Sequence, residues 1–142
     1  MIRGHEIYRA TQTQTATRAE LVVMLYEGAI RFLQQAFGAL QSEDFEVAHN
    51  ALIKAQRIVE ELQIRIDRER GPFSDGLNAL YAFMLRELEA ANAKKDRQKV
   101  LAAIGLLNEL LTAWRQAARQ PVVERGASHP AAAFATPSGN VE

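Results

Sequence analysis

Apolar residues recur at helical spacing along most of the chain, most densely between residues 18 and 41. One stripe of that segment advances by three or four residues at a time: Leu21, Val22, Leu25, Gly28, Ala29, Phe32 and Ala36. A second stripe follows at i, i+4, i+7 and i+11: Tyr26, Ile30, Leu33 and Phe37. Since a surface helix needs only one apolar stripe, this segment is either central in a bundle or serves a partner with its second face.

Cap signals set the bounds of the first two expected helices. Thr17 and Glu20 have the spacing of a reciprocal capping box, which predicts a helix from about Arg18 to Gln41. Asp44 is the expected N-cap of a second helix, from about Phe45 to Arg68.

Two further helices are expected after the break at Gly71-Pro72, because proline cannot continue the helical hydrogen-bond ladder. Ser74 is the expected N-cap of the third helix, which extends to about Lys94. Asp96 is the expected cap of the fourth, from about Arg97 to Arg119.

Each of the last three helices has its own core-facing stripe. These stripes are Phe45, Ala48, Leu52, Ala55, Val59, Leu62 and Ile66; Leu77, Leu80, Tyr81, Met84, Leu88 and Ala91; and Val100, Ala103, Ile104, Leu107, Leu110, Leu111 and Trp114. Short connections make neighbouring helices antiparallel, so the expected fold is an all-α, up-down-up-down four-helix bundle.

Three regions are expected. Residues 1–16 form an N-terminal arm with few apolar side chains, of which Ile7 and Tyr8 can dock. Residues 17–120 form the bundle. Residues 121–142 hold three of the four prolines and no periodicity, which predicts a disordered tail.

Charge and composition exclude several classes of protein. Lys plus Arg and Asp plus Glu number 17 each, so the formal net charge is zero and there is no general attraction to nucleic acid. Cysteine is absent, which excludes disulfides and thiol chemistry. No signal peptide and no apolar run of roughly 20 residues is visible. We therefore expect a cytoplasmic protein without membrane insertion.

The sequence offers little catalytic chemistry. Glu46 and His49 form one Glu-x-x-His motif, whereas a di-iron bundle uses two. His49 is also the sole candidate for phosphotransfer, but the lysine expected three residues later is Leu52. We expect no catalytic residue, no metal and no cofactor.

What remains is apolar surface beyond the tidiest core stripes, carried by Tyr26, Ile30, Ile53, Ile64, Phe83 and Leu106. Ile53 and Ile64 are eleven residues apart, which places them nearly in line on one flank of their helix, with Arg57 and Glu60 between them. A partner helix lying in a groove is one explanation. A broad core stripe is the other, and self-association of the bundle is a further alternative.

Several segments resemble the FliS family of flagellin-export chaperones. They are Tyr8, Thr15-Ala16-Thr17, Glu20-Leu21-Val22, Met24-Leu25-Tyr26-Glu27-Gly28-Ala29-Ile30-Arg31-Phe32, Lys54-Ala55-Gln56-Arg57-Ile58-Val59-Glu60-Glu61-Leu62, Leu80-Tyr81-Ala82-Phe83-Met84-Leu85, Ala91-Asn92, Leu110 and Trp114. The resemblance runs from about Tyr8 to Ala118, in order, and the Met-Leu-Tyr-Glu-Gly run is its most specific part.

The resemblance implies a cytoplasmic bundle that binds the C-terminal segment of flagellin, blocks its premature polymerisation and delivers it to the flagellar export apparatus. Other flagellar regulatory or export proteins are further candidate partners. The arm is implied to cover part of the binding surface when no client is present. The residues expected to bind flagellin are Ile7, Tyr8, Tyr26, Ile30, Ile53, Arg57, Ile64, Tyr81, Phe83 and Leu106.

Overall fold

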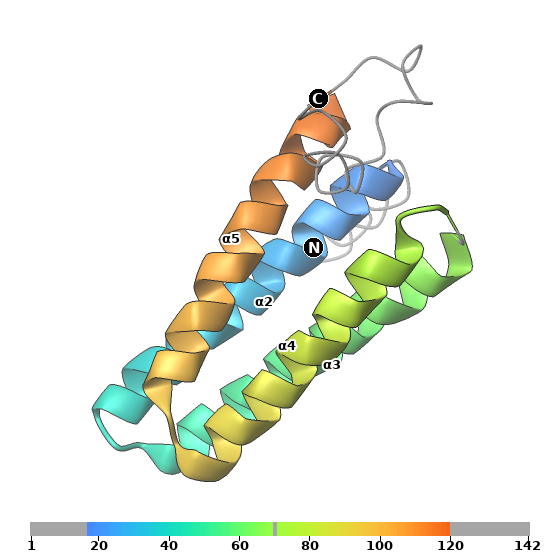
Figure 1. Ribbon diagram of the computed structural model, residues 1–142. Helices are drawn as coiled ribbons and strands as arrows, with labels where there is room; N and C mark the ends of the chain where they lie inside the picture. Colours follow the sequence, from blue (N-terminus) through green and yellow to red (C-terminus); the bar gives the residue numbers. More distant parts are fainter. Residues whose placement is uncertain (1–16, 70, 120–142) are drawn as a thin grey trace, which may run out of the picture.

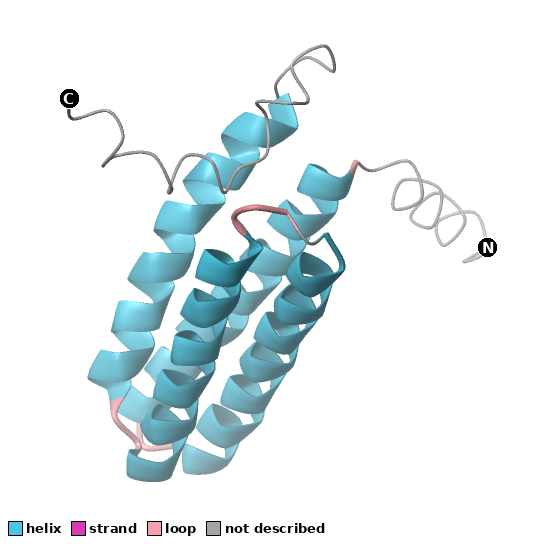
Figure 2. Cartoon of the chain, turned by 45° about the vertical axis from the view of Figure 1, so that its right-hand side comes forward, coloured by secondary structure: helices cyan, strands magenta, loops and turns pink. Residues whose placement is uncertain are grey.

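The computed structural model describes residues 17–69 and 71–119. They form four helices, α2 (Arg18–Gln41), α3 (Phe45–Glu69), α4 (Ser74–Lys94) and α5 (Arg97–Arg119) (Figure 1). Helix α2 packs along α3 and α5, and α4 packs along the same two helices from the opposite side. Consecutive helices run antiparallel and are joined by short loops at the two ends of the bundle (Figure 2). The predicted all-α, up-down-up-down bundle is confirmed.

Three helix starts carry the predicted caps. Thr17 and Glu20 form both hydrogen bonds of the capping box, at 2.8 and 3.1 Å. Asp44 Oδ1 accepts a hydrogen bond from the backbone N–H of Val47 at 3.4 Å. Asp96 Oδ1 accepts one from the backbone N–H of Gln98 at 3.0 Å. Each side chain satisfies a donor that the first turn of a helix leaves unpaired.

The start of α4 differs from the prediction. Phe73, not Ser74, is its N-cap residue, and it provides no side-chain hydrogen bond. Ser74 lies inside the helix, where its hydroxyl accepts a hydrogen bond of 2.8 Å from the backbone N–H of Gly71. Ser74 therefore stabilises the turn before the helix rather than the helix terminus, and its prediction as N-cap was wrong.

The two apolar stripes of α2 are explained by its two neighbours. Tyr26 and Leu33 of the second stripe are fully buried, and Ile30 is 7% exposed. The first alternative, a helix central in the bundle, is therefore correct for these residues. Gly28 permits the close packing of α3, because a Cβ atom at this position would lie 3.3 Å from Cδ1 of Ile58.

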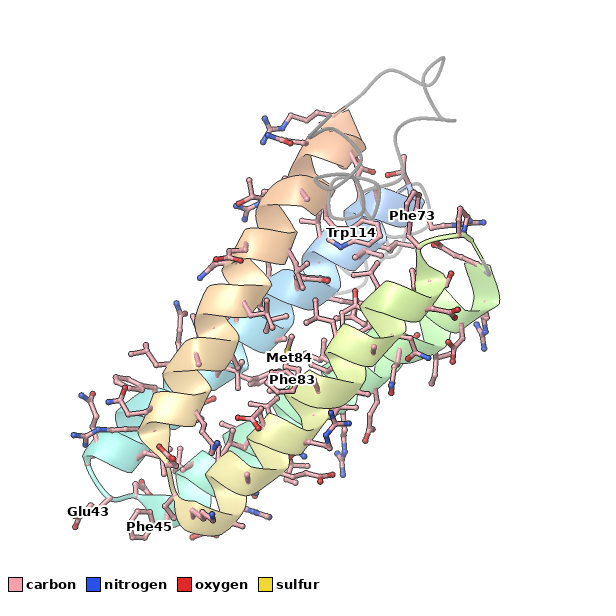
Figure 3. All side chains as sticks on the ribbon, in the orientation of Figure 1. Glu43, Phe45, Phe73, Phe83, Met84 and Trp114 are labelled. Carbon is pink, nitrogen blue, oxygen red and sulfur yellow. The ribbon has the colours of Figure 1, made fainter. Side chains whose placement is uncertain are left out.

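The predicted core positions of the other helices are largely buried, with one clear error. Phe45 is 45% exposed, whereas the next stripe residue, Ala48, is fully buried. Phe45 is the first residue of α3 and lies at the very end of the bundle (Figure 3). The helical period locates a face of α3, but it does not show that the end of the helix lies beyond the packed core. Leu80 and Ile104 are half-buried.

Two tyrosine hydroxyls meet inside the core. Tyr26 of α2 and Tyr81 of α4 share a hydrogen bond of 2.6 Å, and their rings pack edge-on with centroids 6.4 Å apart. The Trp114 ring of α5 lies 6.4 Å from that of Tyr26. Burial raises the pKa of Tyr26 to about 12, against the opposing effect of its hydrogen bond with Tyr81. Burial also raises the pKa of Tyr81 well above its ordinary range.

Ion pairs join α5 to both of its neighbours at the surface. Lys99 Nζ lies 3.0 Å from Glu87 Oε1 of α4, and Arg115 lies 2.7 Å from Glu27 of α2. The hydrogen bond to Glu87 raises the pKa of Lys99. Exposed pairs of this kind contribute little to stability, but they mark which sides of α4 and α5 face each other. Across the described ranges, no helix is both long and apolar enough to cross a membrane.

Candidate interaction surfaces

The residues predicted to bind a partner fall into three groups in the structure. Ile7 and Tyr8 lie outside the described residues. Tyr26, Ile30 and Tyr81 are buried in the core at 0%, 7% and 1% exposure. The expectation that Tyr26 and Ile30 lie off the core is therefore wrong, because the second stripe of α2 is covered by neighbouring helices. The remaining five lie at the surface or at its edge.

The α3 flank is the first of two such surfaces, and we use this name for Ile53, Arg57 and Ile64. Ile64 is 46% exposed, Arg57 is exposed and Ile53 is half-buried. Lys54, about one helical turn before Arg57, reaches toward α2, where its Nζ lies 5.4 Å from the centre of the Phe32 ring. Of the α3 flank, Ile53 lines the groove beside α4, and Arg57 and Ile64 face solvent.

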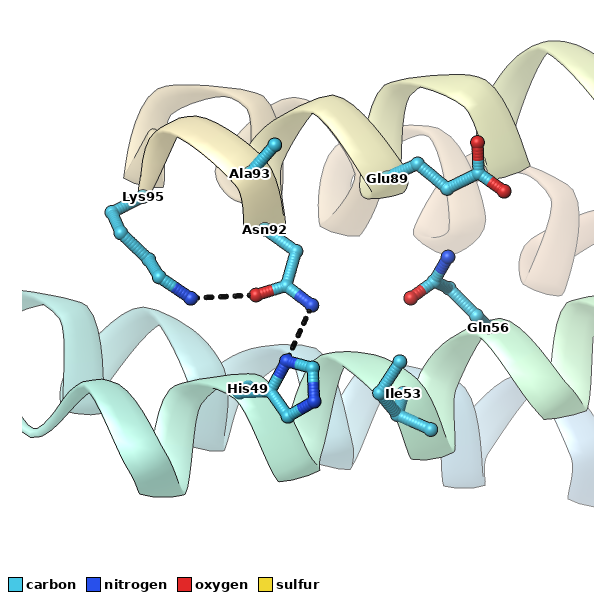
Figure 4. A pocket seen from close by; sticks show the side chains of 7 residues that line it. All are labelled: His49, Ile53, Gln56, Glu89, Asn92, Ala93 and Lys95. Atoms are coloured by element: carbon cyan, nitrogen blue, oxygen red, sulfur yellow. Dashed lines mark hydrogen bonds between the residues drawn. The ribbon is translucent and has the colours of Figure 1, made fainter.

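A groove of about 550 Å3 opens beside the α3 flank, between α3 and the end of α4. Its lining residues come from α3, from α4 and from the turn that follows α4: His49, Ile53, Gln56, Glu89, Asn92, Ala93 and Lys95 (Figure 4). Ile53 contributes apolar surface, and most of the other side chains are polar. The groove therefore presents both apolar surface and hydrogen-bonding groups.

A chain of hydrogen bonds holds one end of this groove. Lys95 Nζ donates to Asn92 Oδ1 at 2.7 Å, and Asn92 Nδ2 lies 2.9 Å from His49 Nδ1. An ammonium group is only a donor, so it fixes the carbonyl oxygen of Asn92 toward Lys95. The Asn92 amide must then donate to His49, which makes Nδ1 an acceptor and leaves the ring proton on Nε2. The network thus ties α3 to α4 and specifies the tautomer of His49.

Gln56 is the buried polar residue of the groove. It is 9% exposed, and within the described part of the chain its Oε1 atom is buried and accepts no hydrogen bond. Leaving such an acceptor unpaired costs about 1–3 kcal/mol in a folded protein. The sequence reasoning missed this residue, although His49 and Gln56 are polar at seven-residue spacing beside the core stripe of α3.

The α4–α5 seam is the second surface, defined here by Leu80, Phe83 and Leu106. Phe83 is 46% exposed, and the other two are half-buried. Phe83 lies one helical turn before Glu87, which pairs with Lys99 of α5. It is therefore on the side of α4 that faces α5, close to Met84 in Figure 3. The predicted surface residues therefore divide between the α3 flank and the α4–α5 seam and do not form one patch.

Sequence reasoning also overlooked several exposed apolar residues. Met24 is 49% exposed, Leu101 is 46% exposed and Val47 is 36% exposed. The only indication of their exposure in the sequence is that each lies off the apolar stripe of its helix. In the described ranges, no group of three or more His, Asp or Glu residues is placed to hold a metal ion.

Comparison with known proteins gives a consistent family. The family model described as "Flagellar protein FliS" matches residues 1–121. The flagellar secretion chaperone FliS of Bacillus subtilis (strain 168) is 34% identical over 121 residues, which cover 85% of this chain and 90% of that protein. Its counterpart from Salmonella typhimurium is 34% identical over 104 residues, 72% of this chain and 77% of that protein. The flagellar secretion chaperone FliSB of Pseudomonas aeruginosa is 30% identical over 104 residues, 72% of this chain and 82% of that protein. The chain therefore belongs to the FliS family of flagellar secretion chaperones.

Proposed function

We propose that this protein is a non-enzymatic chaperone of the cytoplasm that binds the C-terminal segment of flagellin. Binding keeps the segment from polymerising before export and presents the client to the flagellar export apparatus. The family membership and the names of the relatives support a secretion chaperone. The choice of flagellin as client follows from the resemblance of the Met24–Phe32 run and the later motifs to chaperones of that client.

The observation that carries the proposal is the α3 flank beside an open groove. Ile64 of α3 remains 46% exposed, whereas the stripe of the same helix from Ala48 to Ile66 is buried. Burial of apolar surface stabilises a complex by roughly 25 cal/mol per Å2. For a client that is disordered when free, this gain must exceed the entropy lost when the segment becomes ordered. The result is binding that can be reversed at the export apparatus.

Three substitutions test the position of the client. Ile64→Asp replaces an exposed side chain, so the thermal unfolding temperature should change little while binding of a flagellin C-terminal peptide weakens by several kcal/mol. Leu52→Asp puts a charge into the fully buried core and should unfold the domain. Ile53→Asp should fall between them, because Ile53 is half-buried.

The measurements are thermal unfolding and isothermal titration calorimetry with the full chain. Wild-type protein that does not bind the peptide would refute the proposed client. An Ile64→Asp variant that is stable and binds as tightly as wild type would place the client on another face, such as the α4–α5 seam. Sedimentation of the free protein checks the alternative of self-association, which predicts dimers that Ile64→Asp dissociates.

The arm is proposed to regulate this binding through Ile7 and Tyr8. Deletion of residues 1–14 retains Thr17 and Glu20, so the helical content should be unchanged. The affinity for the flagellin peptide should change, rising if the arm competes with the client and falling if it clamps it. An unchanged affinity in calorimetry would refute a role for the arm.

A further inference from the structure

Gln56 is the feature of the groove that the packing of the bundle leaves unexplained. It lies on the groove-facing side of α3 and is 9% exposed. Figure 4 shows its amide between the two helices, with the nitrogen toward Glu89 and the oxygen toward the His49 end of the groove. Its Oε1 atom accepts no hydrogen bond from any described residue. A leucine here would fill similar space without leaving an acceptor unpaired.

None of the side chains that line the groove donates a hydrogen bond to this oxygen. The amide of Asn92 is committed to His49, and Lys95 Nζ donates to the carbonyl of Asn92. Glu89 also lines the groove, and an ionised carboxylate only accepts hydrogen bonds. Glu89 thus presents acceptors on the side of the groove away from Lys95, while Gln56 Oε1 faces the His49 end (Figure 4). The terminal amide of glutamine rotates over a broad range, so Oε1 can turn toward a ligand in the open groove.

We propose that Gln56 and Glu89 together bind a basic side chain of the client segment, preferably arginine, while apolar client residues contact Ile53. This proposal rests on the proposed function. A guanidinium group has several N–H donors and a positive charge, so it matches a neutral acceptor beside a carboxylate. Backbone N–H groups inside a bound helix are already paired, which makes a side chain the appropriate donor. Lys95 at the other end of the groove disfavours the reverse orientation of the client.

The test uses the full chain and a peptide from the flagellin C-terminus. Gln56→Leu should unfold at the same temperature as wild type or above it, because the unpaired acceptor is removed. Its dissociation constant for the peptide should rise about tenfold or more. Glu89→Gln, at an exposed position, should also weaken binding and reduce its dependence on salt concentration. Gln63→Leu is the matched control: Gln63 lies seven residues further along α3 and does not line the groove, so binding should be unchanged.

The outcomes separate this proposal from the proposed function. If wild type binds the peptide and Gln56→Leu binds equally well, Gln56 is only a structural residue and the inference is wrong. If Glu89→Gln binds as wild type, the cationic donor is excluded. If wild type does not bind the peptide, the proposed function fails and this inference fails with it. Gln56→Met, which keeps an unbranched side chain, replaces Gln56→Leu if the latter lowers the unfolding temperature.

Discussion

The hydrogen bond between Tyr26 and Tyr81 predicts a strong non-additivity between two conservative substitutions. The hydroxyl oxygens are 2.6 Å apart, and the two residues are 0% and 1% exposed. Tyr26→Phe keeps the ring packing but leaves the Tyr81 hydroxyl without this partner in the core. Tyr81→Phe does the same to Tyr26. A buried polar group that loses its partner costs about 1–3 kcal/mol, so each single substitution should reduce the free energy of unfolding by this amount.

The double variant should be much less destabilised than the sum of the two losses. Replacing both partners by apolar groups of the same shape leaves no unpaired hydroxyl, so the double variant should lose little more than the hydrogen bond between Tyr26 and Trp114. The expected coupling energy is therefore about 1–3 kcal/mol, the range found for residues in direct contact. Urea unfolding of wild type and the three variants measures it, with circular dichroism for helix content and the sole tryptophan, Trp114, for the core. The midpoint should shift while the slope of the transition stays constant.

Additivity would refute this reasoning. If the double variant loses as much free energy as both single variants together, the two hydroxyls act independently and the short contact contributes no coupling. Leu33 is a buried residue of the same helix outside the hydroxyl contact. Combining Leu33→Ala with Tyr81→Phe is therefore the control, and these two losses should add more closely than those of the tyrosine pair.

Three further predictions follow from the fold. Thr17→Ala removes one half of the capping box and should reduce the free energy of unfolding by about 1 kcal/mol, measured by urea titration against wild type. Gly105→Ala should raise it by about 0.5–1 kcal/mol, because an added Cβ at this exposed helical position meets open space; a loss would show that the site is not free. Alkaline pH should destabilise the protein, because the pKa of Tyr26 is raised to about 12, so that its stabilisation is fully present below pH 10 and is lost as the pH rises through 12. The loss corresponds to about 3 kcal/mol, and a Tyr26→Phe variant titrated over the same range should lack this contribution.

Most of the fold was predictable because caps and periodicity are local properties of the chain. The capping box of Thr17 and the N-caps Asp44 and Asp96 needed only residues within one turn. The prediction of Ser74 as N-cap failed because its hydroxyl accepts a hydrogen bond from the backbone N–H of Gly71. That hydrogen bond depends on the geometry of the whole turn. The prediction that Phe45 is a core residue failed because its burial depends on where the neighbouring helices end.

The candidate surfaces were less predictable because they depend on how helices are arranged around one another. The second apolar stripe of α2 is compatible with contact to a partner protein or to a second helix of the bundle. Only the packing of the helices shows that Tyr26 and Ile30 are core residues. By contrast, Ile64 and Phe83 were correctly expected outside the core, since they lie off the stripes of their helices. The groove at Gln56 combines residues from α3 and α4 that are more than thirty positions apart, so no local pattern contains it.

The antiparallel order of the helices from α2 to α5 has a practical consequence for experiments on client delivery. Helix α2 begins and α5 ends at the same end of the bundle, beside the loop between α3 and α4 (Figures 1 and 2). A client peptide fused beyond α5 through a flexible linker therefore starts close to the N-terminal start of α2. Tethering of this kind gives local concentrations of about a millimolar. A single-chain fusion can hold even a weakly bound flagellin segment on the chaperone, and a protease site in its linker would release the client on demand.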